Sequence, residues 1–132
     1  MIVDTMVFAY ALLGVTQHRT IAAHILESVD RIDVPDLFRA ELANVVSLWV
    51  RHKAVDLRTA FDVLEDAETL VSKVWPTDLL WERAVELAVT KGHPVYDTLF
   101  VALAETLDSR VASFDRQLKR KFPDLVVLGE DY

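Results

Sequence analysis

An acidic residue lies on the apolar face of a predicted helix in the last third of the chain. In residues 93–107, HPVYDTLFVALAETL, apolar side chains recur at helical spacing. Asp97 shares its face with Phe100, Val101 and Ala104. The helix dipole favours a negative charge in the first turn, which explains an aspartate there but not its place on the apolar face. Because an ionised carboxylate is costly to bury alone, we expect a partner for Asp97.

Three further carboxylates occupy positions of the same kind. Asp4 directly follows the apolar run MIV, and Asp115 directly follows RVASF, so each comes at the end of a predicted strand. Each also precedes a predicted helix and can serve simply as its N-cap. Glu41 shares a helical face with Val45 and Trp49, or lies at the margin of that face with its carboxylate in water.

These acids could converge at one site, and four negative charges in a small space repel one another. A divalent cation among them would remove that repulsion, and oxygen-only ligands favour Mg²⁺ or Mn²⁺. A zinc site is disfavoured, because the chain has no cysteine and its four histidines show no ligand spacing. The absence of a glycine-rich phosphate loop disfavours nucleotide binding.

The elements that must position these residues alternate between strands and helices. Apolar runs predict strands at about 1–3, 32–34, 72–76, 109–114 and 125–128. Periodicity predicts helices over about 5–13, 17–29, 37–52, 57–70, 77–90, 93–107 and 115–122, with Asp56 and Thr77 as N-caps. The alternation predicts an α/β fold with a mostly parallel central sheet and helices on both faces. In such sheets, ligands bind at the carboxyl ends of the strands, where Asp4 and Asp115 are expected.

The length of 132 residues predicts a single domain, residues 1–132. The apolar N-terminal segment is interrupted by Asp4, lacks a basic leader and is too short to span a bilayer, so we expect no membrane attachment. The lack of cysteine fits a reducing cytoplasm. A net charge of −7 argues against nucleic-acid binding through bulk electrostatics, with Arg51–Lys53 and Arg116–Lys121 as local exceptions. Taken on their own, both segments are better explained as solvated helix ends, where cations also suit the helix dipole.

The chain resembles the PIN domain family, and within it the VapC-type toxins of prokaryotic toxin–antitoxin pairs, from Met1 to about Leu128. IVDTMVFAYAL resembles the opening strand with the first acidic residue, Asp4, and PDLFRAELANVV resembles the segment with Glu41. HPVYDTLFVALAETLDSRVASFDRQL resembles the segment with the third and fourth acids, Asp97 and Asp115. Ser113 matches a small hydroxyl residue two positions before the fourth acid.

The resemblance implies a PIN-like three-layer sandwich and a metal-dependent endoribonuclease that leaves 5′-phosphate and 3′-hydroxyl ends. It implies that Asp4, Asp97 and Asp115 bind Mg²⁺ or Mn²⁺, directly or through water, and that Glu41 completes the site or orients the attacking water. It further implies a cognate antitoxin protein and a homodimer as partners. The apolar segment VFAYALL and the helix around Trp49 are candidate partner surfaces, or core.

Other functions remain open at this point. A haloacid-dehalogenase-type site requires an aspartate two residues after the first, where this chain has Met6. A receiver domain requires an acidic pair near the first strand and a lysine after a late strand, but Asp4 stands alone and the first lysine after RVASF is Lys119. The remaining alternative is a non-catalytic PIN-like domain that binds RNA or a protein partner.

Overall fold

The computed structural model describes residues 1–14 and 17–132. Within them, five short strands form one parallel sheet in the order β3-β2-β1-β4-β5. The strands are β1 (Ile2–Val3), β2 (Asp33–Pro35), β3 (Lys73–Trp75), β4 (Val111–Ser113) and β5 (Val126–Leu128). All five lie where apolar runs predicted strands; β2 is shifted by one residue, and the other four are shorter than predicted by one to three residues.

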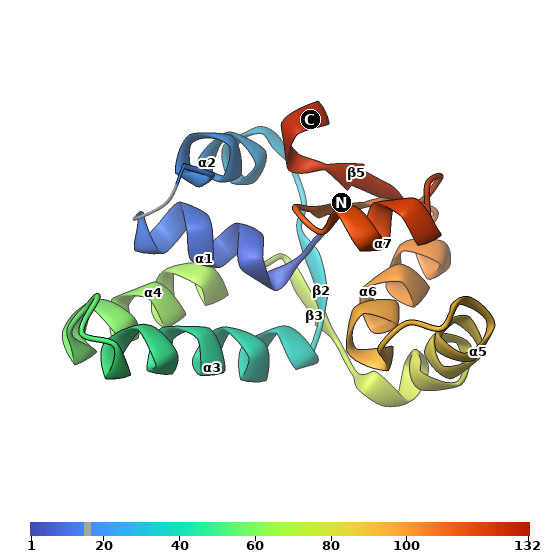
Figure 1. Ribbon diagram of the computed structural model, residues 1–132, viewed down its shortest axis with the longest axis horizontal. Coiled ribbons are helices and arrows are strands. Elements are labelled where there is room, and N and C mark those ends of the chain that lie inside the picture. The colour runs from blue at the N-terminus through green and yellow to red at the C-terminus, as the bar shows by residue number, and fades with distance from the viewer. Residues whose placement is uncertain (15–16) are drawn as a thin grey trace.

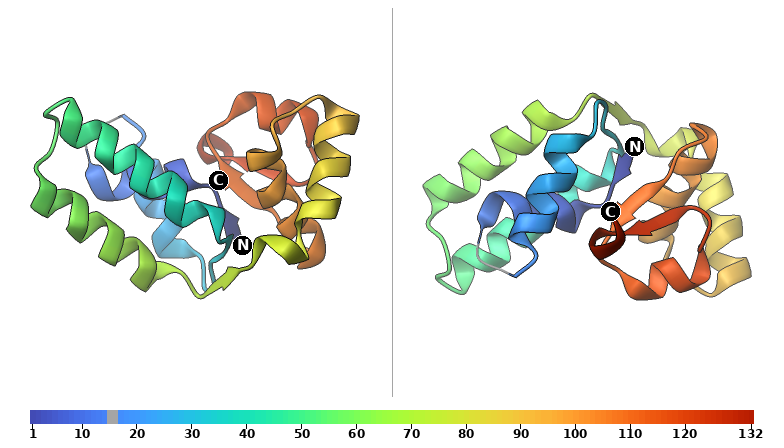
Figure 2. Two further views of the ribbon diagram at one scale, coloured as in Figure 1. Left: turned by 90° about the horizontal axis from the view of Figure 1, so that it is seen from below. Right: turned by 90° about the horizontal axis from the view of Figure 1, so that it is seen from above.

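Helices cover both faces of this sheet, which confirms the predicted α/β architecture. They are α1 (Thr5–Leu13), α2 (Arg19–Ser28), α3 (Leu37–Arg51), α4 (Leu57–Leu70), α5 (Trp81–Lys91), α6 (Val95–Thr106) and α7 (Arg116–Lys121), with short 3₁₀ turns η1 (Thr77–Leu79) and η2 (Gly129–Asp131). Helices α1 to α4 lie on one side of the strands and α5 to α7 on the other (Figures 1 and 2). None of the helices in the described part of the chain is long and apolar enough to cross a membrane.

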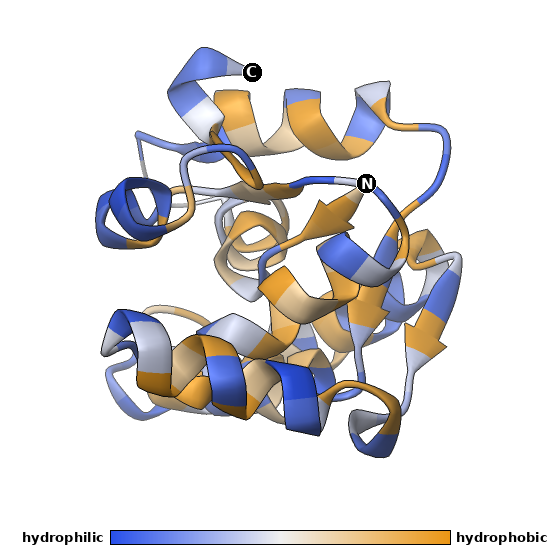
Figure 3. Cartoon of the chain, turned by 90° about the vertical axis from the view of Figure 1, so that its right-hand side faces the viewer, coloured by the Kyte–Doolittle hydropathy of each residue, from blue (hydrophilic) through white to orange (hydrophobic). Residues whose placement is uncertain are grey.

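The centre of the fold is helix α6 packed on the middle of the sheet. It contacts β1, β2 and β4, and every residue from 98 to 104 is buried. Hydrophobic residues predominate in most of the strands and alternate with hydrophilic residues along the helices (Figure 3). Asp97 immediately precedes the buried stretch of α6, so the sheet and the helix together fix its position.

Two details of the helix predictions are corrected by the structure. The helix predicted over 77–90 is a 3₁₀ turn followed by α5, whose first residue is Trp81. Thr77 therefore does not cap α5, and Leu80, which is buried, occupies the N-cap position without a side-chain hydrogen bond. By contrast, the Asp56 cap of α4 is confirmed, because its side chain accepts a hydrogen bond from the Thr59 N–H at 2.8 Å.

Candidate functional site

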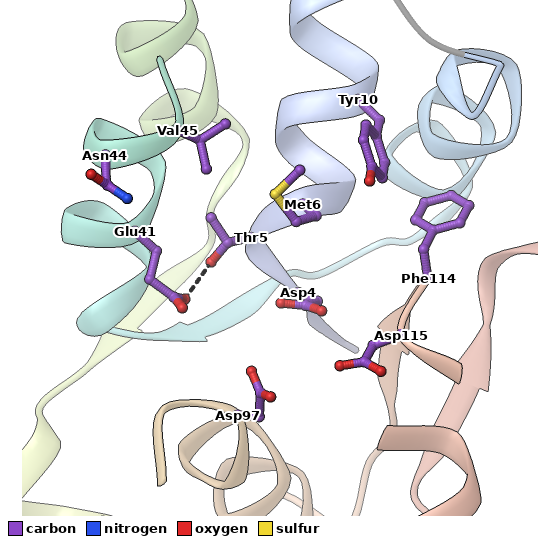
Figure 4. A pocket seen from close by; sticks show the side chains of 10 residues that line it. All are labelled: Asp4, Thr5, Met6, Tyr10, Glu41, Asn44, Val45, Asp97, Phe114 and Asp115. Atoms are coloured by element: carbon purple, nitrogen blue, oxygen red, sulfur yellow. Dashed lines mark hydrogen bonds between the residues drawn. The ribbon is translucent and has the colours of Figure 1, made fainter. Parts of the chain in front are cut away.

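One cleft contains all four acidic side chains selected from the sequence. Its volume is about 340 Å³, and Asp4, Glu41, Asp97 and Asp115 all point toward it (Figure 4). The complete lining consists of Asp4, Thr5, Met6, Tyr10, Glu41, Asn44, Val45, Asp97, Phe114 and Asp115. The cleft lies at the carboxyl ends of β1 and β4, as expected for a parallel sheet.

The pairing of β1 with β4 places Asp4 beside Ser113. Val3 is in register with Ala112, and the Asp4 N–H donates to the Ala112 carbonyl at 3.0 Å. The buried Ser113 hydroxyl then donates to Asp4 Oδ2 at 2.6 Å and accepts from the Asp115 N–H at 3.0 Å. One hydroxyl thus ties together two acidic residues that are far apart in the sequence.

Asp4 is not the side-chain cap of helix α1, although it occupies the N-cap position. Burial is the main reason why the pKa of its carboxyl is raised to about 6. The negative charges of Asp97 and Asp115 raise the pKa further, whereas the hydrogen bond from Ser113 lowers it. The fold therefore holds Asp4 where its ionised form is disfavoured.

Glu41 belongs to helix α3, and a residue of helix α1 holds its carboxylate in place. The buried Thr5 hydroxyl donates to Glu41 Oε1 at 2.8 Å (Figure 4). Burial raises the pKa of Glu41 to about 7, opposed by the Thr5 hydrogen bond and reinforced by the charges of Asp4 and Asp97. Glu41 thus belongs to the acidic cluster and is not simply a margin residue of α3.

The partner expected for Asp97 includes a residue of the chain itself. His93 Nε2 lies 2.7 Å from Asp97 Oδ2, and the histidine side chain is 1% exposed while that of Asp97 is 32% exposed. His93, Asp97 and Asp115 each offer one ligand atom within 4.8 Å of the others. The conclusion that no histidine has ligand spacing is therefore wrong for His93, which stands one helical turn before Asp97.

Asp115 performs the capping role that the sequence offered as the alternative to a site role. Its Oδ1 accepts hydrogen bonds from the N–H groups of Gln117 and Leu118, at 2.9 and 3.1 Å. The same side chain lines the cleft. Capping and a place at the site are thus compatible, because the cap engages only one carboxylate oxygen.

Positive charge does not neutralise this cluster. Within the described residues, no lysine or arginine forms an ion pair with any of the four acids. Arg39 pairs with Asp36 and Glu68 instead. Two features that the sequence did not reveal, the His93 and Thr5 hydrogen bonds, depend on side-chain direction and on a contact between residues 36 apart.

Comparisons with known proteins agree with this geometry. Residues 1–122 match the model of the PIN domain. Ribonuclease VapC3 of Pyrobaculum aerophilum is 34% identical over 87 residues, which are 65% of this chain and 53% of that protein. The chain thus spans about half the length of this curated relative.

Solved structures show the same fold. PAE2754 from Pyrobaculum aerophilum aligns with a TM-score of 0.74 and 23% identity, over 98% of this chain and 88% of that one. A chain of FitAcB from Neisseria gonorrhoeae gives a TM-score of 0.71 and 18% identity, over 99% of both chains. VapC20 of Mycobacterium tuberculosis, described as a toxin that cleaves the sarcin–ricin loop, gives 0.65 and 18%, over 90% of this chain and 92% of that one. From the family match and the shared fold, the chain belongs to the PIN domain family.

Proposed function

We propose that residues 1–132 form one nuclease domain, a metal-dependent endoribonuclease that hydrolyses RNA phosphodiester bonds and acts as the toxin of a toxin–antitoxin pair. One observation carries the proposal: four carboxylates line one cleft, and the fold raises the pKa of two of them without pairing any with a lysine or arginine of the described chain. The names of VapC3 and VapC20 support the ribonuclease activity.

The residues of the cleft fit a divalent cation. The donor set consists mainly of carboxylate oxygens, which hard ions such as Mg²⁺ and Mn²⁺ prefer. Asp4, Asp97 and Asp115 would hold the cation, and Glu41 would complete the site or orient the attacking water. When bound, such a cation activates water near neutral pH and stabilises the negative charge of a leaving oxygen.

The surrounding residues give the acids fixed orientations. Ser113 donates to Asp4 and Thr5 donates to Glu41, each at one carboxylate oxygen. His93 holds one oxygen of Asp97 in the same way. Each acid therefore keeps its other oxygen for the cleft, which is the arrangement that ordered metal ligands need.

RNA would enter the cleft from its flanks. The segment Arg51–Lys53 is exposed and is available to phosphates. The second basic segment is less available, because Lys119 donates to the Pro123 and Val126 carbonyls and Lys121 to the Gly92 carbonyl. We expect phosphate contacts from the first segment and from the exposed Arg116 of the second, so RNA binding should weaken as salt increases.

The proposed protein partners, an antitoxin and a second copy of the chain, require exposed apolar surface. The segment VFAYALL provides only part of it, because Val7, Phe8 and Ala9 are fully buried, whereas Tyr10, Ala11 and Leu12 are partly exposed. A group of exposed apolar side chains lies on η1, α5 and the start of α6. Its members are Leu79, Trp81, Val85, Val89 and Tyr96. We propose this surface for the homodimer, and the cytoplasm as the compartment where toxin and antitoxin meet.

An RNA-cleavage assay tests the proposal. The purified chain should cut single-stranded RNA with Mg²⁺ or Mn²⁺ and stop with EDTA, and Asp97→Asn should abolish cutting. Asp108→Asn is the matched control, since Asp108 is exposed just beyond the same helix and its φ of 48° suits asparagine. Equal activity of Asp97→Asn and Asp108→Asn, or activity indifferent to EDTA, would exclude the assigned site. RNA binding without cutting would favour the non-catalytic alternative.

A further inference from the structure

Three aromatic rings meet at one end of the acidic cleft. The centroids of Tyr10 and Phe114 are 5.3 Å apart with the rings nearly perpendicular, at 78°. The His18 ring lies 4.7 Å from Phe114 and 4.9 Å from Tyr10, tilted by about 40° to each. Tyr10 and Phe114 both line the cleft, beside Asp115 (Figure 4).

These rings differ from the aromatic side chains of the core. Phe8, Phe38 and Phe100 are at most 1% exposed. Tyr10, His18 and Phe114 are only partly buried. Each of these three rings is therefore partly covered by the protein, and the rest of its surface faces the solvent next to the acidic residues.

The Phe114 ring is held firmly in place. It stands between the buried Ser113 and Asp115, and it lies directly against the backbone of Gly129. A Cβ atom at residue 129 would come within 2.4 Å of Phe114 Cε1, so only glycine permits this approach. The ring is thus preorganised at the rim of the cleft.

Phe114 also forms a wall of a second cavity of about 350 Å³. His18, Gln17 and Arg116 line this cavity together with Glu130. The Arg116 guanidinium is 73% exposed and lies 2.6 Å from a carboxylate oxygen of Glu130. A chain leaving the acidic cleft over Phe114 would thus meet an aromatic surface first and an exposed guanidinium next.

We propose that Tyr10, His18 and Phe114 form a stacking site for one unpaired nucleobase of RNA, next to the phosphate that is cut. This inference rests on the proposed nuclease function. Proteins commonly bind single-stranded RNA by stacking its bases on aromatic side chains that lie beside the site for the RNA backbone. Such stacking is possible because every base has a face that can stack. A duplex offers no free base face, so the site selects single-stranded segments.

The test combines protein and RNA changes. A set of cleavable oligonucleotides, each with one abasic nucleotide, is cut by the wild type, by Phe114→Leu and by Tyr10→Leu. We expect one position next to the cut where loss of the base lowers the wild-type kcat/KM by about 5- to 100-fold. Phe114→Leu should cut the abasic and intact RNA at similar rates, since the stacking partner is already missing. Phe61→Leu, which changes an exposed ring on α4, should keep the full base dependence.

A binding measurement separates this inference from the nuclease proposal. RNA with 2-aminopurine at each position in turn is added to Asp97→Asn, and the fluorescence of the stacked position should be quenched. The quenching should disappear when Phe114→Leu is added to the same variant. If the wild type cuts no RNA but the quenching depends on Phe114, the nuclease function fails and the stacking site stands. If no position shows base dependence, or Phe114→Leu and Tyr10→Leu retain it fully, the stacking site is refuted.

Discussion

Removing a charge from the site should stabilise the protein when no divalent cation is present. The substitution is Asp4→Asn. It keeps an oxygen that can accept the hydrogen bond from the Ser113 hydroxyl, and it removes the negative charge. The pKa of Asp4 is raised from 3.8 to about 6 in the folded protein. The folded state therefore holds this proton more tightly than the unfolded chain does.

The sign and the size follow from that shift. Stability is lost as the pH rises from about 4 to about 6, and the whole cost is present above pH 6. Each pKa unit corresponds to about 1.4 kcal/mol, so the difference amounts to about 3 kcal/mol. Asp4→Asn should thus raise the free energy of unfolding by about 3 kcal/mol at pH 7.5 and change it little at pH 4. Relief of the repulsion on Glu41 acts in the same direction.

The assay is urea unfolding in EDTA at a series of pH values from 4 to 8. Asp33→Asn is the control, because Asp33 is even more buried than Asp4 but its pKa is lowered. Burial alone would raise that pKa, and hydrogen bonds from Arg31 and Trp75, with the Arg31 charge, overcome the effect. Asp33→Asn should therefore destabilise the protein at pH 7.5. A destabilised Asp4→Asn, or an effect of Asp4→Asn that is the same at every pH, would refute the reasoning.

Saturating Mn²⁺ should remove the advantage of Asp4→Asn. A ligand at 100 times its dissociation constant stabilises the folded state by about 2.7 kcal/mol, close to the cost of the buried charge. The wild type gains this amount, whereas the variant lacks one of the proposed ligands and gains less.

Three other changes test separate contacts. His93→Leu should weaken Mn²⁺ binding by about 10- to 100-fold in titration calorimetry, because Asp97 loses its hydrogen-bond donor. His93→Gln should retain most of the affinity. Equal Mn²⁺ affinities of His93→Leu and the wild type would leave His93 only a packing role. Gly129→Ala should lower the free energy of unfolding by about 1 to 3 kcal/mol, through the clash with Phe114, and an unchanged urea midpoint would contradict it. Trp81→Glu should convert the proposed dimer to monomer in light scattering with an unchanged circular dichroism spectrum, since Trp81 is 54% exposed; a persistent dimer would place the interface elsewhere.

The sequence was sufficient to predict the helices and strands because the patterns that indicate them are local. Helix α1 begins and ends where its apolar pattern predicts, and the capping of α4 by Asp56 follows from one residue type at one position. The error at residues 77–90 has a physical reason. Leu80, Ala84 and Leu87 keep helical spacing and are all buried, so the apolar pattern does not change at the point where the 3₁₀ turn gives way to α5.

The positions of Asp4 and Asp115 could be predicted because strand ends meet at one edge of a parallel sheet. Those of Glu41 and Asp97 could be predicted because each shares the apolar face of a helix. Their hydrogen bonds could not, since each depends on a contact that the fold creates. Thr5 is adjacent to Asp4 in the sequence, yet its hydroxyl serves Glu41 on another helix. The His93–Asp97 contact was within reach from spacing alone, but Pro94 between the two residues marks a helix start and leaves the ring direction open.

Asp33 and Asp4 show that the same fold stabilises one carboxylate and leaves another without a positive partner. Asp33 lies in β2, and an arginine and an indole N–H satisfy its carboxylate, so its ionised form is favoured. Asp4 follows the neighbouring strand β1, and its hydrogen bond from Ser113 does not offset burial and the repulsion of nearby acids. A chain that needed Asp4 only for stability would do better with asparagine there. A divalent cation, as proposed above, would compensate this charge, so the cluster should be most stable when the cation occupies the cleft.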